Sequence, residues 1–197
     1  MRRRLVLLSA VSGALSGALT LGRSTGVAAR QATSSLADHP MTGTWVAMAN
    51  PPLPDDPQFP APSLFSADGT VLLVFPTTQV GPEGVFFNAP VMGTWEADSD
   101  RRGHFTAIQL MSAADGTFLG SIAIDGYPEV SADGQTLIDD GSRAVITIRD
   151  AAGTIVNQVQ PTGQPAGRPV TAVRMGVGVS GFPDGAAAAT TETAPTP

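Results

Sequence analysis

Apolar and polar residues alternate with a period of two along much of the second half of the chain. The segments TFLGSIAID (117–125) and RAVITIRD (143–150) both follow this pattern, and their apolar positions include Phe118, Ile122, Ile124, Ile146 and Ile148. Successive side chains of a β-strand point to opposite faces of a sheet, so a period of two indicates a strand with one buried face. We therefore expect half-buried strands at both places.

Four further segments have the composition of strands. TVLLVF (70–75) is apolar on both faces, which predicts a strand covered on each side, and the others are HFTAIQLMS (104–112), TIVNQVQ (154–160) and VTAVRM (170–175). An apolar stripe with the 3.6-residue period of a helix is sustained nowhere in the sequence. The pattern predicts an all-β domain.

Asp-Gly and related turn sequences separate these segments. They are SADGT (66–70), AADGT (113–117), SADGQT (131–136), DDGS (139–142) and DAAGT (150–154). Because Asp-Gly accepts the positive φ values of tight hairpin turns, we expect the chain to reverse its direction at each of them. Their spacing leaves no room for crossover helices and favours an antiparallel barrel or a sandwich.

Two proline-containing stretches interrupt the pattern. NPPLPDDPQFPAPS (50–63) carries six prolines, and because proline has no N–H to donate to a sheet, we expect this stretch to be a loop. The second stretch runs from Pro76 to Pro90 and combines turn residues with the aromatic pair Phe86 and Phe87, which we expect to be exposed.

The N-terminal residues 1–29 have the composition of a signal peptide. Three arginines precede an apolar run broken by Ser and Gly, and the stretch ends in Val27-Ala28-Ala29, small residues of the kind that a signal peptidase accepts. The run from Leu5 to Leu21 is short for a membrane span, which needs about 20 strongly apolar residues, and an uncleaved anchor is the alternative. The sequence leaves open whether the general or the twin-arginine route is used.

The remaining chain divides into three parts by composition. Residues 30–41 are a linker, residues 42–176 are the β-domain, and residues 177–197 are rich in Ala, Thr, Pro and Gly. Such a tail buries too little apolar area to offset the entropy of ordering, which predicts disorder, with a wall-proximal spacer as the alternative.

Charge and cysteine content narrow the partners and the compartment. The net charge is −6, and loss of residues 1–29 removes four of the eleven basic residues, all arginines, which leaves seven against seventeen acids and a net charge of −10. An acidic surface repels nucleic acid and anionic lipid headgroups, so we expect no nucleic-acid partner and no stable membrane insertion after signal removal. The chain has no cysteine, so its stability must come from its core. We expect a secreted or extracytoplasmic protein of the periplasm or cell envelope.

The tripeptide Gly-Thr-Trp occurs twice, at 43–45 and 93–95, and contains both tryptophans of the chain. MTGTW (41–45), which precedes the long proline-rich stretch, resembles the Gly-x-Trp motif that opens the first strand of lipocalins and related calycin barrels. The resemblance spans residues 42–175 and rests on Gly43, Trp45 and Arg174, the last in the position of an arginine that lipocalins pack over this tryptophan. The Thr-Asp-Tyr motif and the C-terminal helix of lipocalins are absent.

The resemblance implies an antiparallel up-and-down β-barrel of about eight strands, with residues 50–63 as a lid loop, and a β-sandwich is the alternative fold. It implies a binding protein for a small hydrophobic molecule, with no catalytic residue, no metal and no cofactor. The residues that we expect to face the ligand are Trp45, Phe87, Trp95, Phe118, Ile122 and Ile146, while Gly43, Trp45 and Arg174 have structural roles.

Two other functions stay open from the side-chain chemistry. Glu96, His104 and Tyr127 are the candidate acid–base groups of a barrel enzyme that cyclises or isomerises an apolar substrate, although the polar cluster EADSDRRGH (96–104) is more typical of a solvated hairpin tip. The chain offers neither Cys nor Lys as a nucleophile, and the spacing of its ligand-type residues matches no metal motif. The third hypothesis is a structural or interaction β-domain of the cell envelope.

Overall fold

A computed structural model describes residues 35–51, 55–81 and 84–182, and these form one antiparallel β-sheet. The expected signal peptide and residues 183–197 of the expected tail lie outside the described residues. The only helical element within the described ranges is the three-residue 3-10 turn η1 (Leu36–Asp38). No helix in this part of the chain is long and apolar enough to cross a membrane.

Thirteen strands make up the sheet, which confirms the prediction of an all-β antiparallel fold. They are β1 (Gly43–Ala49), β2 (Phe59–Phe65), β3 (Thr70–Leu73), β4 (Thr78–Gly81), β5 (Gly84–Asn88), β6 (Val91–Ala97), β7 (Gly103–Ser112), β8 (Phe118–Gly126), β9 (Glu129–Val130), β10 (Thr136–Asp139), β11 (Val145–Asp150), β12 (Ile155–Val159) and β13 (Val170–Arg174).

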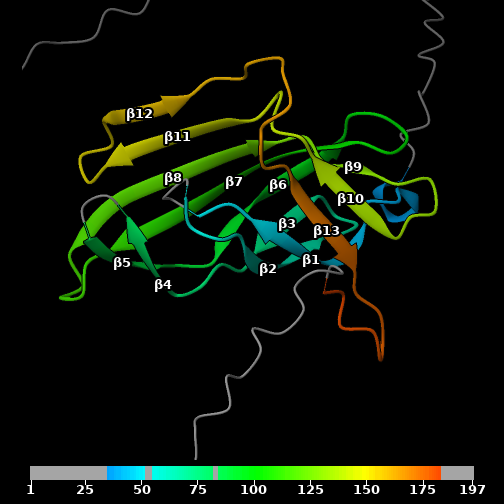
Figure 1. Cartoon of the computed structure of the whole chain (residues 1–197), viewed down its shortest axis with the longest axis horizontal. Helices are drawn as coiled ribbons and strands as arrows, with labels where there is room; N and C mark the ends of the chain where they lie inside the picture. The colour runs from blue at the N-terminus through cyan, green and yellow to red at the C-terminus, as the bar shows by residue number, and fades with distance from the viewer. Residues whose placement is uncertain (1–34, 52–54, 82–83, 183–197) are drawn as a thin grey trace, which may run out of the picture. The chain divides into compact units, whose positions relative to one another are not determined.

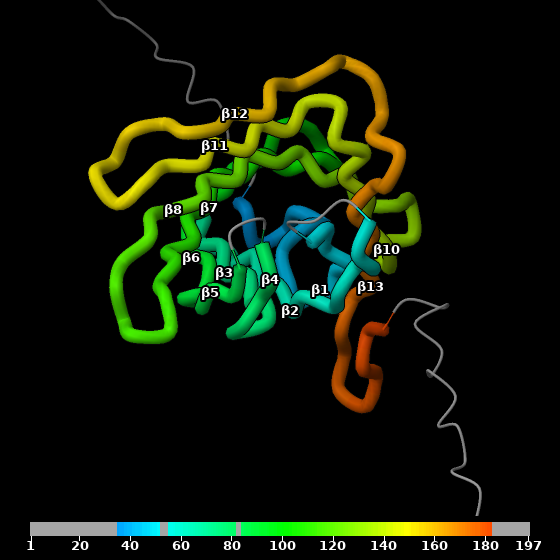
Figure 2. The backbone as a smooth tube through the Cα atoms, turned by 60° about the vertical axis from the view of Figure 1, so that its left-hand side comes forward, coloured from blue at the N-terminus to red at the C-terminus, as the bar shows by residue number. Residues whose placement is uncertain are grey.

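The sheet curls strongly into a half-barrel (Figure 1). Its hydrogen-bonded order is β12-β11-β8-β7-β6-β3-β2-β1-β13-β10-β9, and the β4–β5 hairpin joins β7 through β5. Figure 2 shows the result of this curl, with β11 and β12 across the interior from β1 and β2. The sheet therefore has a concave inner face and a convex outer face.

One margin of the sheet, β9, closes onto the start of the inner strand β7 at one end of the curl, which we call the base. Arg102 bridges to Glu129, the Gly103 N–H donates to the Pro128 carbonyl at 3.0 Å, and the Val130 N–H donates to the Arg101 carbonyl at 2.9 Å. Through these bonds β9 links β10 to the start of β7. At the opposite end β12 is hydrogen-bonded to β11 alone among the described strands, so the sheet stays open there.

Four of the five turn sequences reverse the chain as predicted, between β2 and β3, β7 and β8, β9 and β10, and β11 and β12. The prediction is wrong at DDGS (139–142). There β10 pairs antiparallel with β9, and β11 pairs antiparallel with β8, which runs in the same direction as β9. The chain thus keeps its direction through Gly141, whose φ of 75° produces a kink rather than a hairpin.

The prediction that residues 50–63 form a loop is wrong for residues 59–63, which belong to β2. Both Pro60 and Pro62 lie in this strand, opposite Met48 and Val46 of β1. The Pro62 carbonyl accepts the Val74 N–H at 2.9 Å, so the proline nitrogens face the β3 side. Regular β2–β3 pairing begins only at Ser63. The N–H groups that Pro60 and Pro62 lack therefore remove few hydrogen bonds from the sheet. The second interruption, residues 76–90, contains the β4–β5 hairpin, in which Phe86 is buried and Phe87 is exposed.

Residues 36–41, which the sequence assigns to a linker, pack against the sheet. Met41 is fully buried and joins the core. The His39 ring lies 5.5 Å from the ring of Trp95, its Nδ1 accepts the Met41 N–H at 3.1 Å, and its Nε2 is 2.9 Å from the Ser99 carbonyl. This segment covers part of the base.

The core occupies the base of the half-barrel. Both tryptophans are buried there, and their indole N–H groups donate to the carbonyls of Met41 and Ser66 at 2.9 and 2.8 Å. Phe65 packs edge-on against Trp95 and Phe105. A large aromatic cluster with satisfied polar atoms fills this end of the half-barrel.

Candidate functional site

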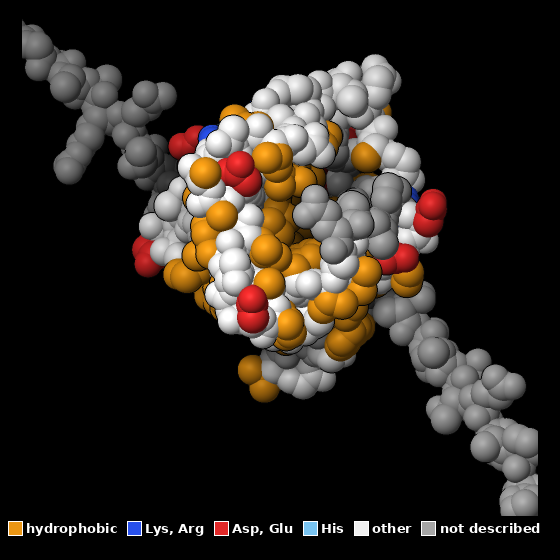
Figure 3. Space-filling model, turned by 90° about the vertical axis from the view of Figure 1, so that its left-hand side faces the viewer, with side chains coloured by type: hydrophobic (Ala, Val, Ile, Leu, Met, Phe, Trp, Pro, Cys, Tyr) orange, Lys and Arg blue, Asp and Glu red, His pale blue; other side chains and the backbone are white. Residues whose placement is uncertain are grey.

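The concave face of the sheet encloses a cavity of about 310 Å³. Figure 3 shows hydrophobic side chains lining a hollow at the end of the molecule that lies to the left in Figure 1. The floor is formed by aromatic side chains of the core, and the walls are aliphatic. The lining includes Trp45, Phe65, Phe105, Ala47, Ala61, Ala172, Leu73, Leu137, Ile124, Ile146, Phe75, Val159 and Val170.

Three alanines in register explain why side chains do not fill this space. Ala47 of β1 lies directly between Ala61 of β2 and Ala172 of β13. Ala47 is the next inward-facing residue after Trp45 along β1. The row of three alanine methyl groups therefore lies directly above the indole of Trp45. Short side chains on three adjacent strands leave the space above Trp45 unfilled.

The polar groups of the lining are bonded within the protein. Ser63 Oγ donates to the Ala61 carbonyl at 3.0 Å. The carboxylate of Asp139 accepts backbone N–H groups from Tyr127 at 2.7 Å and from Gly141 at 2.9 Å. Backbone donors on both of its oxygens hold this carboxylate and the adjoining chain in place. The cavity is therefore suited to apolar contact.

The rim of the cavity is tied together by amide side chains. Asn50 Nδ2 donates to the Arg168 carbonyl at 3.0 Å. Gln58 Nε2 lies 2.9 Å from Asn50 Oδ1 and 3.0 Å from the Pro169 carbonyl. These bonds join the two ends of the β1–β2 connection to the segment before β13. They hold these two parts of the rim next to each other.

The residues that the sequence assigns to the ligand do not all meet at this cavity. Trp45 and Ile146 line it. Trp95 lies in the core at the base, and Ile122 faces inward on β8 without lining the cavity. Phe87 and Phe118 are exposed and lie away from it.

The alanines Ala47, Ala61 and Ala172 were not singled out from the sequence. A signal for the first exists in β1, where Trp45, Ala47 and Ala49 alternate on one face. No such signal shows that Ala61 and Ala172 lie beside Ala47, because this depends on the pairing of strands far apart in the chain.

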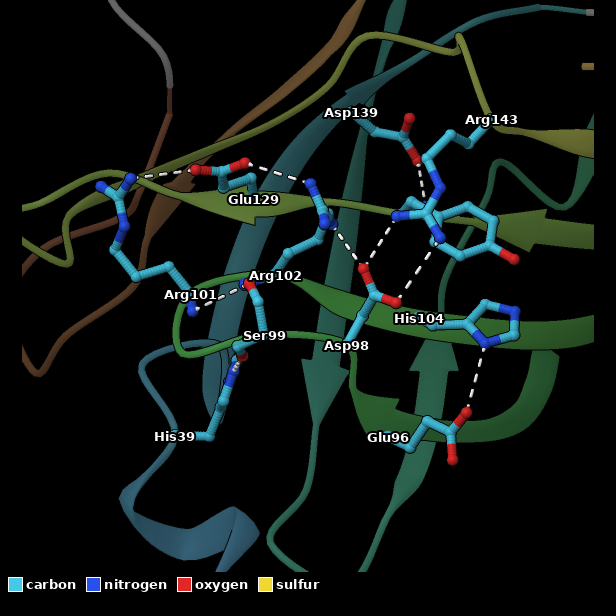
Figure 4. A network of polar contacts seen from close by, with 11 residues as sticks. His39, Glu96, Asp98, Ser99, Arg101, Arg102, His104, Glu129, Asp139 and Arg143 are labelled. Atoms are coloured by element: carbon cyan, nitrogen blue, oxygen red, sulfur yellow. Dashed lines mark hydrogen bonds and ion pairs between the residues drawn. The ribbon is translucent and has the colours of Figure 1, made fainter. Parts of the chain in front are cut away.

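The candidate acid–base residues lie in a separate polar network on the outer side of the base (Figure 4). His104 Nε2 is 2.8 Å from Asp125 Oδ1, and its Nδ1 is 3.4 Å from Glu96 Oε1. The imidazole stacks on the Tyr127 ring at 4.4 Å, and the Arg143 guanidinium lies 3.8 Å from the centre of that ring. Neither histidine lines the cavity.

Ion pairs extend this network across the base. Asp98 contacts Arg102 at 2.6 Å and Arg143 at 2.8 Å, and Glu129 contacts Arg101 at 3.0 Å. Hydrogen bonds from Arg143 and, to a smaller extent, from Arg102 lower the pKa of Asp98 to about 2. The charges of residues 96–104 thus pair with partners on β9 and before β11, and they connect three parts of the sheet.

Within residues 35–51, 55–81 and 84–182, no group of three or more His, Asp or Glu side chains is arranged to hold a metal ion. Comparison with known proteins found no protein-family model, no curated protein and no solved structure that matches this chain.

Proposed function

We propose that this protein is an exported, lipocalin-like binding protein that holds one small hydrophobic molecule in the cavity above Trp45. The observation that carries the proposal is the apolar hollow itself, which lies on the concave face of a half-barrel and opens at the end opposite the core. A volume of about 310 Å³ is at the lower end of the range for small-molecule sites.

The character of the lining indicates the class of ligand. Aromatic and aliphatic groups form the floor and walls, and the carboxylate of Asp139 is occupied by backbone donors. An ion or a strongly polar molecule would lose its hydration against these aromatic and aliphatic walls without gaining partners from them. A hydrophobic molecule gains about 25 cal/mol for each Å² of its apolar surface removed from water. We therefore expect an uncharged or weakly polar ligand.

Binding is tested first without assuming a ligand. The protein is recovered from its own culture and analysed by native mass spectrometry, where a reproducible bound mass of a lipid or pigment supports the proposal. The second measurement is a titration with N-phenyl-1-naphthylamine, an uncharged fluorescent probe. In a Trp95→Phe background, Trp45 is the remaining tryptophan and should respond to the probe because it lines the cavity.

Two valines on one strand provide a matched pair of variants. Val159 lines the cavity at its open end, whereas Val156 of the same strand does not, and the two side chains are 51% and 60% exposed. Val159→Trp should narrow the cavity and weaken probe binding at least tenfold, and Val156→Trp should leave binding unchanged. Absence of saturable binding, or equal binding by both variants, would contradict the proposal and favour a structural β-domain.

A further inference from the structure

The outer face of the sheet carries an apolar area that nothing in the described chain covers. Leu64, Leu72, Met92 and Ile108 are consecutive partners on β2, β3, β6 and β7, so they form one continuous row. Leu110 of β7 and Val74, the residue that follows β3, lie on the same face, two residues further along. We call this set the outer apolar face; its members are Leu64, Leu72, Val74, Met92, Ile108 and Leu110.

Five of these side chains are exposed to solvent, and Leu72 is half-buried. Met92 is 59% exposed, Ile108 51% and Leu110 50%, although the inward-facing residues between them, such as Ala107 and Gln109, are buried. Together the six side chains expose roughly 500 Å² of apolar surface, which is near the upper end of the largest patches on soluble monomers. Patches of this size commonly mark an interaction site.

The border of the outer apolar face is polar but uncharged on the side towards the base. Thr70, Thr94 and Thr106 are consecutive partners on β3, β6 and β7, and they form the row next to Leu72, Met92 and Ile108. The six members of the face carry no charge. An apolar centre beside a row of hydroxyl groups has the composition of a protein interface with its rim.

We infer that two copies of this protein form a two-fold dimer in which the outer apolar faces pack against each other. A two-fold axis brings the same surface of each copy together, so an uncharged face meets no like charge. Two convex faces of this size bury at most about 1,000 Å² in total, which is the lower limit for a specific interface and fits a weak, reversible dimer.

A lipid surface is a poorer partner for this face. The chain has a net charge of −6, and none of the six residues is basic, so anionic headgroups would be repelled rather than attracted. The outer apolar face also lies on the opposite side of the sheet from the cavity, because Ile108 and Ala107 point to opposite faces of β7. A dimer of this kind leaves both cavities open, and the inference stands apart from the proposed ligand.

The association is measured by analytical ultracentrifugation of the purified protein between about 1 and 100 μM, a range that brackets a micromolar dissociation constant. We expect a reversible monomer–dimer equilibrium. Ile108→Asp places a charge in the centre of the face and should raise the dissociation constant at least tenfold. The matched control is Ile138→Asp, because Ile138 of β10 is 46% exposed and lies outside the face; it should leave the equilibrium unchanged.

A second measurement locates the contact and uses the absence of cysteine from the chain. Met92→Cys should form a disulfide-linked dimer under mild oxidation faster than Ile138→Cys. Circular dichroism of each variant confirms that its sheet is intact. A protein that stays monomeric at 100 μM, an equal effect of both aspartate variants, or binding of the monomer to zwitterionic vesicles through Ile108 would each overturn the inference.

Discussion

The Arg174 guanidinium lies 4.1 Å from the centre of the Trp45 ring, and the two residues are direct partners on β13 and β1. The guanidinium also donates to three backbone carbonyls, those of Gly134 at 2.7 Å, Thr42 at 3.0 Å and Pro40. Burial lowers the pKa of Arg174. One side chain therefore stacks on the core tryptophan and joins three separate segments at the base.

The first prediction concerns this pair. Trp45→Ala should lower the free energy of unfolding by about 3 to 5 kcal/mol, because it empties a large aromatic side chain from the core. The cation–π contact with Arg174 should contribute roughly 0.5 to 2 kcal/mol of coupling in a double-mutant cycle measured by urea unfolding. Strictly additive effects would show that the contact contributes nothing to stability.

The second prediction concerns the glycines of the two Gly-Thr-Trp copies, which make room for different neighbours. A Cβ on Gly43 would approach Arg174 Nη1 to 2.5 Å, whereas a Cβ on Gly93 would approach the Thr106 carbonyl oxygen of β7 to 1.9 Å. Because that backbone must move, Gly93→Ala should cost at least about 2 kcal/mol in thermal unfolding. Gly167→Ala is the control, since no atom lies within 4 Å of its Cβ position. Similar melting temperatures for the two variants would contradict the prediction that Gly93 is needed for the close approach of β6 and β7.

The third prediction concerns acid stability. The pKa of Asp98 is lowered from 3.8 to about 2 by Arg143 and Arg102, so its stabilising effect is complete above about pH 4 and is lost as the pH falls through about 2. The difference in stability between wild type and Asp98→Asn should be constant from pH 5 to 7 and should shrink towards pH 2. Asp100→Asn, at a neighbouring exposed position, is the control for the substitution itself. Urea midpoints measured across this pH range test the sign.

The fourth prediction concerns a buried amide. Gln109 is 2% exposed, and its Nε2 has no hydrogen-bond partner among the described residues. An unsatisfied buried donor costs about 1 to 3 kcal/mol, so Gln109→Met, which keeps a similar length, should raise the free energy of unfolding by roughly 1 kcal/mol. Gln158→Met should not stabilise, because Gln158 Nε2 donates to Thr147 Oγ1 at 3.0 Å. A less stable Gln109→Met protein would indicate that the amide is bonded through a water molecule.

Some of the fold could be read from the sequence because it depends on local properties. The period-two pattern of TFLGSIAID and RAVITIRD places strands where β8 and β11 occur, and the turn sequences at 113–117 and 131–136 reverse the chain. Alternation and turn conformation are set within a few residues along the chain.

Other features followed from tertiary pairing alone. The segment 139–142 has the residues of a hairpin turn. However, β8 and β9 run in the same direction along β7, one after the other. Their antiparallel partners β11 and β10 therefore also run in one direction, and the chain does not reverse between them. Pro60 and Pro62 fit inside β2 because their nitrogens face β3, and β3 forms few hydrogen bonds with this part of β2. Neither outcome is contained in the local sequence.

Local sequence specifies an antiparallel all-β chain with Trp45 near the start of its first strand, since strand alternation and turn chemistry act over short distances. The position of the cavity, in contrast, depends on how distant strands pair. Ala47, Ala61 and Ala172 leave a hollow because strand pairing sets three small side chains side by side, and Leu64, Leu72, Met92 and Ile108 form one face for the same reason. Register between distant strands is a property of the whole sheet, and it determines which side chains become neighbours.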